Sequence, residues 1–442
     1  MMKSVLIRMV LAALLGVTSA TAFGEPVRPP VQGGRDLTGA LTLQQVVAQV
    51  LLHNPELQAY SFEIRAREAR ALQERLFPNP RIMLDTQDVL GSSGFKGFQQ
   101  SQTTVTLSQV IELGGKRVRR DRAAMLNRDL ASWDYEVARM NVLTQTAKAY
   151  ADALAAQEKL KLARELVALS QKSFNAVKAR VTAGKVSPIQ EIKARVAVSS
   201  TQMALRQAEN NLKAAYRRLA ALWGSPKVSF DSVQGRLYHI ALLPEFETLT
   251  ARLRDNPDIA RWSVELLQRE AAVDLEKANA VPNLRVGAGA RWFEETRDNT
   301  FIFELSIPLQ FFDRNQGAIA EARHRLAKAR ARQRAVEIQL NTALSDSYTR
   351  LVNAHERVTS LKTDILPAAR RAFEAVNEGY RFGKFGYLEM LDSQRTWFNA
   401  RAQFLDALAE YHKAVADVER LTGAAMSPSG SISPPATGGT AP

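Results

Sequence analysis

The fold is decided by residues 116–183, which read KRVRRDRAAMLNRDLASWDYEVARMNVLTQTAKAYADALAAQEKLKLARELVALSQKSFNAVKARVTA. Neither glycine nor proline interrupts these 68 positions, so no residue in them is expected to stop a helix. At 1.5 Å per residue, one helix over this stretch would extend about 100 Å. A helix of that length does not fit a compact bundle and predicts an elongated, coiled-coil-like structure.

Several other helices are predicted along the chain. Long ones are expected over residues 189–223, 318–366 and 387–422, and shorter ones over 41–52, 56–77 and 258–281. Pro367 is expected to kink the helix that begins at Ala318. Alanine recurs along single helix faces, for example at Ala147, Ala151 and Ala155, which permits close contact between neighbouring helices.

The sequence indicates two tandem copies of one unit. His53-Asn54-Pro55-Glu56-Leu57 recurs 202 positions later as Asp255-Asn256-Pro257-Asp258-Ile259. Weaker matches follow in the same order at offsets of 198 or 199, among them Ala149-Tyr150 with Ser347-Tyr348 and Ala183-Gly184-Lys185 with Phe382-Gly383-Lys384. The common order and nearly constant offset predict a tandem duplication.

The first residues predict export from the cytoplasm. Lys3 and Arg8 precede a short apolar run and an Ala-x-Ala site, so we expect cleavage after Ala22. About nine apolar residues are too few to cross a bilayer, which needs roughly twenty, and no later stretch predicts a transmembrane helix. The predicted organisation is a signal peptide at 1–22, an irregular segment at 23–37, a first repeat at 38–225, a linker at 226–242, a second repeat at 243–423 and a disordered tail at 424–442.

Composition excludes several classes of function. The net charge of +14 raises nucleic acid as a partner, but export argues against it. Basic runs such as Arg117-Arg119-Arg120 are interleaved with Asp and Glu, which predicts solvated helix faces. The chain has no cysteine, which excludes disulfides, thiolate metal sites and thiol catalysis. The five histidines are dispersed, and no catalytic, cofactor-binding or metal-binding set is predicted.

Each half contains one predicted β-hairpin. Residues 284–292 and 301–309 alternate apolar and polar side chains, while the first half does so less regularly at 82–86 and 104–108. Four strands cannot close a barrel in a membrane, where open edges leave backbone groups unpaired. Either the strands form a small soluble sheet or several chains share one barrel, and the residues alone leave both possibilities open.

The arrangement over about residues 38–423 resembles the TolC-type outer-membrane efflux channels. The resemblance rests on the duplicated unit of helix, hairpin and long helices, with paired glycine tips. Within that superfamily, Ala183-Gly184-Lys185-Val186-Ser187-Pro188 with Lys193-Ala194, and Leu219-Ala220-Ala221-Leu222-Trp223-Gly224, resemble the CzcC-like factors of cobalt–zinc–cadmium efflux systems.

The resemblance implies a mainly α-helical fold with a small β part. Three chains would form a homotrimer with a 12-stranded barrel in the outer membrane of a Gram-negative bacterium and a long periplasmic α-barrel. It implies a channel rather than an enzyme, without a cofactor, exporting divalent cations of Co, Zn, Cd or Ni. The implied partners are a periplasmic adaptor (membrane-fusion) protein, an inner-membrane RND pump and outer-membrane lipid, with no nucleic acid. Many relatives carry a lipidated N-terminal cysteine, and we expect this chain to lack that anchor.

The resemblance also assigns residues to the periplasmic tip. Glu389 and Asp392 match the family's aperture carboxylates and, being three apart on a helix, share a face on which rings of acids would favour cations. Tyr380 matches the gate tyrosine, Gln190 stands where an acid is common, and Phe385 stands where relatives hold an arginine. The residues assigned to the tip turns and to adaptor contact are Gly184, Lys185, Ser187, Pro188, Gly383 and Lys384.

Two alternative functions remain. The first is a TolC-like channel for drugs or for type I secretion. The second belongs to another class, a soluble periplasmic coiled-coil adaptor or scaffold. An adaptor should carry one helical hairpin flanked by β-rich domains, whereas this sequence predicts two long hairpins and a duplication.

Overall fold

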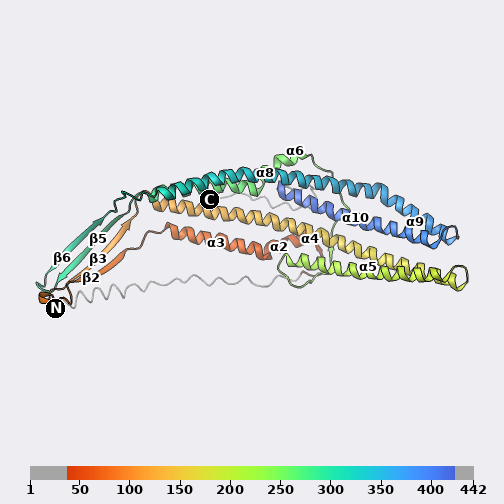
Figure 1. The fold of residues 1–442 in the computed structure, drawn as a ribbon, viewed down its shortest axis with the longest axis horizontal. Helices are drawn as coiled ribbons and strands as arrows, with labels where there is room; N and C mark the ends of the chain where they lie inside the picture. The colour runs from red at the N-terminus through yellow and green to blue at the C-terminus, as the bar shows by residue number, and fades with distance from the viewer. Residues whose placement is uncertain (1–36, 424–442) are drawn as a thin grey trace. The chain divides into compact units, whose positions relative to one another are not determined.

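The computed structural model describes residues 37–423 (Figure 1). The predicted signal peptide at 1–22, all but the last residue of the predicted segment at 23–37, and the predicted tail at 424–442 lie outside the described residues. The described part is mainly helical with a small sheet, as predicted. None of its helices combines the length and the apolar character needed to cross a membrane.

Both halves contain a helix, a β-hairpin and a long helical hairpin, in that order. The first half comprises β1 (Ala40–Thr42), α2 (Leu43–His53), α3 (Pro55–Arg75), β2 (Arg81–Gln87), the turn η1 (Ser93–Phe95), β3 (Gln102–Ile111), α4 (Lys116–Thr182) and α5 (Pro188–Ala221). The connection to the second half contains β4 (Ser232–Gln234). The second half comprises α6 (Phe246–Arg252), η2 (Leu253–Asp255), α7 (Pro257–Asn279), β5 (Leu284–Phe293), β6 (Asn299–Ser306), α8 (Gln316–Ser360), η3 (Leu361–Ile365), α9 (Leu366–Arg381) and α10 (Tyr387–Thr422).

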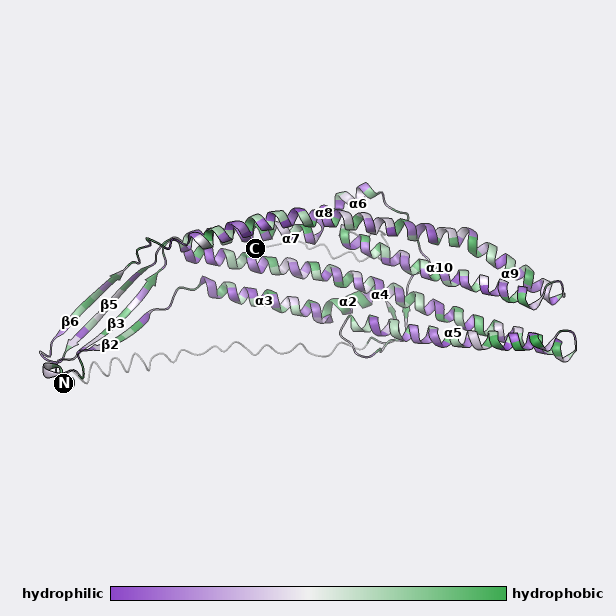
Figure 2. Cartoon of the chain, in the orientation of Figure 1, coloured by the Kyte–Doolittle hydropathy of each residue, from purple (hydrophilic) through white to green (hydrophobic). Residues whose placement is uncertain are grey.

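Helix α4 is the longest element and ends one residue before its predicted limit. It packs against α3, α5, α7 and α10. Alanine supplies many of its buried positions, namely Ala123, Ala124, Ala131, Ala138, Ala151, Ala153 and Ala155. Because alanine adds little bulk and loses no side-chain entropy, these positions allow close helix packing. Figure 2 shows hydrophilic and hydrophobic residues alternating along the long helices, as expected where one face packs and the other meets water.

The predicted kink at Pro367 takes the form of a π-helical turn. Proline has no N–H to donate to the carbonyl group of Thr363, four residues earlier, and its ring crowds that carbonyl. The segment Leu361–Ile365, which ends two residues before the proline, widens into a π turn, and α9 continues from it. The proline therefore interrupts the regular helix without ending it.

Two asparagines at equivalent positions of the two halves each connect the start of one helix with the end of another. The Asn54 side chain accepts a hydrogen bond from the N–H of Leu57, capping α3, and its amide donates to the carbonyl oxygen of Leu222 at 2.7 Å. Asn256 likewise caps α7 and donates to the carbonyl oxygen of Leu421 at 2.8 Å. Both asparagines are buried. The recurring Asn-Pro pair thus begins one helix and satisfies the end of another, while its proline occupies a first-turn position that needs no N–H donor.

Two tyrosines at repeat-related positions hold the segments that lead into the two halves. The Tyr150 hydroxyl hydrogen-bonds the carbonyl oxygens of Leu41 and Gln234, on the parallel strands β1 and β4. Tyr348 donates to the carbonyl oxygen of Pro244 at 3.1 Å. Burial raises the pKa of Tyr150 to about 12, so this hydroxyl remains a donor at neutral pH. The weak match between Ala149-Tyr150 and Ser347-Tyr348 therefore reflects a shared structural task.

The four longer strands form one antiparallel sheet in the order β2-β3-β5-β6. Its register places Ile82, Leu107, Ala288 and Phe303 in one row across the sheet. On this face Phe301 and Phe303 are 83% and 84% exposed in the single chain. The opposite face is mostly polar and carries Arg81, Asp85, Thr104, Thr106, Arg291 and Glu304. The sheet therefore has one exposed apolar face and one largely polar face.

A glycine permits close strand packing on the polar face. A Cβ atom at Gly289 would lie 2.4 Å from the carbonyl oxygen of Val105 on β3. A side chain at this position would therefore push β5 away from β3. Nearby, the Arg291 guanidinium donates through Nε to the Thr104 hydroxyl at 3.0 Å, which fixes this arginine across the two strands.

The asparagine contacts predict a specific loss of stability. Asn256→Ala leaves the Leu421 carbonyl without its side-chain donor and removes the cap of α7, and we expect the free energy of unfolding to fall by about 1–3 kcal/mol. Thermal denaturation in detergent, followed by circular dichroism, measures the change. Asn211→Ala is the matched control, because Asn211 is exposed and its side chain hydrogen-bonds only Gln207 within the described residues. Equal melting temperatures for the two variants would contradict the assigned role of Asn256.

Candidate functional site

The tips of the two helical hairpins, α4–α5 and α9–α10, pack against each other (Figure 1). Their shared apolar cluster draws residues from all four helices, namely Val177, Ala194, Tyr380, Tyr387, Met390 and Leu391. The structure therefore brings the two predicted turns together, although about 200 residues separate them in sequence.

Each hairpin turns at a glycine with positive φ. At the first tip, the N–H of Gly184 donates to the carbonyl oxygen of Val181 and that of Lys185 to Arg180, both at 2.9 Å. The same pair of bonds recurs around Gly383. The φ angles of the two glycines are +68° and +77°, a region where a side chain is strained. This Schellman pattern explains why both long helices end at glycine.

The helices that leave the two tips begin differently. The Ser187 hydroxyl accepts a hydrogen bond from the N–H of Ile189 and Pro188 follows it, so α5 has a serine cap and a first-turn proline. Helix α10 follows Gly386, whose N–H donates to the Glu389 carboxylate at 2.6 Å. Lys185 and Lys384 are exposed at the tips.

The two predicted aperture carboxylates are exposed at the start of α10. Glu389 lies in its first turn and Asp392 one turn further along. Within the described residues, neither carboxylate lies in a salt bridge. Their spacing places them on one side of the helix, so their negative charges can act together on a nearby ion.

Tyr380 and Gln190 are placed in or beside the buried cluster at the tips. Tyr380 is 7% exposed, and its hydroxyl oxygen has no hydrogen-bond partner in the described part. The side-chain oxygen of Gln190 is also buried and unpaired there. An unpaired buried polar atom costs about 1–3 kcal/mol, which makes this packing less stable than an apolar contact of the same size.

Arg180 joins the two hairpins, and the sequence analysis missed it. Its guanidinium donates to the carbonyl oxygen of Tyr380 at 3.3 Å, and its Cζ atom lies 4.8 Å from the centre of the Tyr380 ring. The signal for it was a difference between the halves, because the first half has Arg180 four residues before its tip glycine and the second has Gly379. Gly379 is covered by Phe385, whose ring would lie 2.3 Å from an added Cβ atom.

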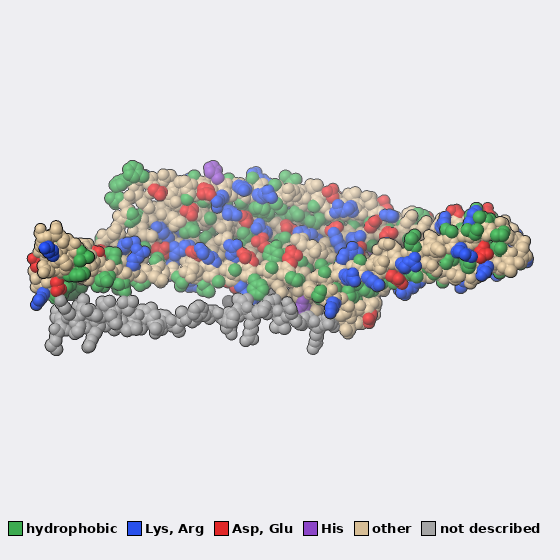
Figure 3. Space-filling view, turned by 60° about the horizontal axis from the view of Figure 1, so that its bottom comes forward, with side chains coloured by type: hydrophobic (Ala, Val, Ile, Leu, Met, Phe, Trp, Pro, Cys, Tyr) green, Lys and Arg blue, Asp and Glu red, His purple; other side chains and the backbone are tan. Residues whose placement is uncertain are grey.

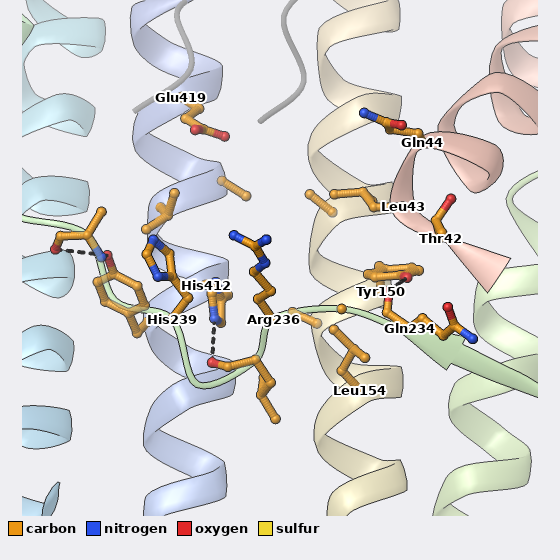
Figure 4. A pocket seen from close by; sticks show the side chains of 18 residues that line it. Thr42, Leu43, Gln44, Tyr150, Leu154, Gln234, Arg236, His239, His412 and Glu419 are labelled. Carbon is orange, nitrogen blue, oxygen red and sulfur yellow. Dashed lines mark hydrogen bonds between the residues drawn. The ribbon is translucent and has the colours of Figure 1, made fainter. Parts of the chain in front are cut away.

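A cavity of about 330 Å³ lies between α4, α10 and the connection that precedes the second half (Figure 4). His412 projects toward this connection and its Nε2 lies 2.8 Å from the carbonyl oxygen of Leu237. Burial lowers the pKa of His412, and the Leu237 contact partly offsets that effect. The neighbouring Tyr411 hydroxyl accepts from the N–H of Ala241. His412 and Tyr411 therefore hold the connection in place.

Within residues 37–423, no group of three or more His, Cys, Asp or Glu side chains is arranged to hold a metal ion. The strongest candidate site is therefore the paired tip, with its exposed carboxylates and its contact between hairpins.

Comparisons with known proteins agree with this architecture. A family model described as outer membrane efflux protein matches residues 46–225 and 249–424. The cobalt-zinc-cadmium resistance protein CzcC of Cupriavidus metallidurans is 33% identical over 389 residues, with 88% of this chain and 91% of that protein covered. The nickel-cobalt-cadmium resistance protein NccC of Alcaligenes xylosoxydans xylosoxydans is 28% identical, with 69% of this chain and 68% of that protein covered.

Solved structures share the fold at lower identity. The outer membrane protein VceC of Vibrio cholerae has a TM-score of 0.72 at 17% identity, with 87% of this chain and 97% of that chain covered. The Campylobacter jejuni CmeC outer membrane channel has a TM-score of 0.72 at 17% identity, with 86% of this chain and 85% of that chain covered.

The Arg180 contact predicts a change in the dynamics of the tip. We expect Arg180→Ala to loosen α9 from the first hairpin, because it removes the inter-hairpin hydrogen bond and the contact with the Tyr380 ring. Hydrogen exchange read by mass spectrometry should show several-fold faster exchange over residues 376–390. Arg195→Ala is the control, because Arg195 is exposed and, in the part of the chain that the structure describes, pairs only with Glu191 on its own helix. Unchanged hydrogen exchange in the Arg180 variant would contradict the role of this residue in the contact between the tips.

Proposed function

Because the chain belongs to the outer membrane efflux protein family, we propose that it is the outer-membrane channel of a tripartite efflux system that exports divalent heavy-metal cations. The observation that carries this proposal is the exposed apolar face of the sheet, which leads directly into two long helical hairpins. Such a sheet suits lipid contact, and the hairpins suit a conduit through the periplasm. The two hairpins also argue against a soluble adaptor, which should have one.

The sheet edges support a homotrimer. In one chain, β2 and β6 each have one edge without a strand partner in the described part. Unpaired N–H and C=O groups cost several kcal/mol each in the hydrocarbon layer. Three chains would supply 12 strands and close every edge. Channels of this family work as trimers with an adaptor and an RND pump, and we propose this arrangement here.

The paired tip is the proposed periplasmic aperture. Six carboxylates, Glu389 and Asp392 from three chains, would form two stacked rings that attract cations and repel anions. Tyr380 and Gln190 would form the gate, which is supported by their unpaired buried oxygens. The exposed turns would contact the adaptor through Gly184, Lys185, Ser187, Pro188, Gly383 and Lys384. The proposed repeats remain 38–225 and 243–423, joined by the linker at 226–242.

The proposed cargo rests on the relatives. CzcC and NccC are named for resistance to cobalt, zinc, cadmium or nickel, and the match to CzcC covers most of both chains. The exposed tip carboxylates suit a divalent cation, because each ring of negative charge would lower the electrostatic energy of the cation at the constriction.

A deletion strain tests the function and its carboxylates. We expect loss of the gene to lower tolerance of Zn, Co and Cd several-fold, and the wild-type gene to restore it. The double variant Glu389→Gln/Asp392→Asn should restore tolerance only in part, and its purified channel should show a several-fold lower preference for cations in planar bilayers. Glu191→Gln is the control, because this nearby carboxylate pairs with Arg195.

Each outcome addresses a separate part of the proposal. Unchanged metal tolerance in the deletion strain would contradict the proposal that the cargo is a metal cation. Unaltered ion preference in the double variant would contradict the proposed carboxylate rings, but not the proposed channel.

A further inference from the structure

Exposed basic side chains gather where the chain passes from the sheet into the long helices. We define the basic collar as the half-buried Arg117 and the exposed Arg119 and Arg122 near the start of α4, together with the exposed Arg314, two residues before α8, and Arg323 near the start of α8. Both helices begin shortly after a strand, and Figure 1 shows that the first turns of α4 and α8 lie at the same end of the helical part, next to the sheet. Figure 3 shows Lys and Arg side chains on the surface of the helices.

Within residues 37–423, most of the positive charges of the collar are not closely paired with a carboxylate of the chain. Glu112 and Glu74 both pair with Arg120, which lies outside the collar. Arg119 approaches Asp274 only at 3.8 Å. Within residues 37–423, Arg122, Arg314 and Arg323 have no carboxylate within salt-bridge distance. Arg314 donates through Nε to the carbonyl oxygen of Gln310 at 3.3 Å, which leaves its other N–H groups free of a carboxylate. The three guanidinium groups can therefore pair with an anion from outside the chain.

Exposed apolar side chains lie at the same level. Phe77 precedes β2, and the Arg117 guanidinium lies 3.9 Å from the centre of its ring. After β6, Leu309, Phe311 and Phe312 are exposed, and Asp313 separates them from Arg314. Aromatic rings with basic groups beside them are typical of the membrane–water interface, where the ring meets acyl chains and the charge meets headgroups. The chemistry changes here from an apolar sheet face to a basic helix surface.

We propose that the basic collar binds the phosphate groups of anionic phospholipids in the periplasmic leaflet of the outer membrane. This inference rests on the proposed function, because it requires the apolar sheet face to lie in that membrane. A headgroup layer is about 5–7 Å thick on each side of the hydrocarbon core. Arg122 and Arg323 lie about 10 Å from the starts of their helices, within reach of that layer by their long side chains.

The same helix supplies an internal control. Lys328, Arg332 and Arg334 are exposed on α8 and have no salt-bridge partner in the described part, but they lie about 18–27 Å from its start. At physiological ionic strength the Debye length is about 8 Å, so these three charges are largely screened from the headgroups. They retain the solvated role that the sequence predicts for basic helix faces.

The test compares lipid retention by two triple variants of the full chain. The collar variant is Arg122→Gln/Arg314→Gln/Arg323→Gln, and the control variant is Lys328→Gln/Arg332→Gln/Arg334→Gln. Each removes three positive charges from exposed sites. The purified proteins are exposed to an equimolar mixture of phosphatidylglycerol and phosphatidylethanolamine, and native mass spectrometry counts the lipids that remain bound.

We expect the wild type and the control variant to retain several-fold more phosphatidylglycerol than phosphatidylethanolamine, and the collar variant to lose that preference. Equal preference in the collar variant and the wild type would overturn the collar, as would an equal loss in both variants. Conductance in planar bilayers is measured on the same samples. A conducting wild type with no phosphatidylglycerol preference overturns the collar alone, whereas a wild type that never inserts overturns the proposed function as well.

Discussion

The unpaired backbone edges of the sheet are the constraint on which the rest of the account depends. One chain supplies four antiparallel strands with an exposed apolar face, and β2 and β6 have no outer neighbour in the described part. A lipid environment cannot satisfy those N–H and C=O groups, but another copy of the chain can. In the proposed trimer, three copies of each tip, carboxylate and collar residue would lie around one axis. Pairing between the sheet edges would therefore arrange single-chain features as rings.

The two repeats share the contacts that end their helices, but they differ at the tips of the hairpins. Asn54 and Asn256 close the two halves by the same pair of contacts, and Gly184 and Gly383 end the long helices in the same way. At the tips the halves diverge, because Arg180 reaches across to the second hairpin while its counterpart Gly379 accommodates Phe385. The repeated residues build the framework, and the unequal residues connect one half to the other.

The sequence predicted the features that depend on local chemistry. Helix α4 was predicted within one residue because glycine and proline are absent from it. Strand β3 runs over Gln102–Ile111, but only 104–108 was predicted, because its Thr and Ser residues weaken the apolar alternation. The short strands β1 and β4 have too few residues for a periodic signal. Arg180 was missed because its partner is 200 residues away, a contact that the sequence pattern does not encode.

Cysteine cross-linking between sheet edges tests the central claim most directly. The chain has no cysteine, so introduced cysteines are the only thiols. Each variant carries one cysteine at Asp85 on β2 and a second on β6, at Thr300, Ile302 or Glu304. The pair Val105→Cys/Ala290→Cys, between neighbouring strands of one chain, verifies that oxidation reaches the sheet. We predict that at least one edge pair gives a covalent trimer in intact outer membranes on a non-reducing gel. Monomer from every edge pair, with the control pair oxidised, would contradict a barrel shared by three chains.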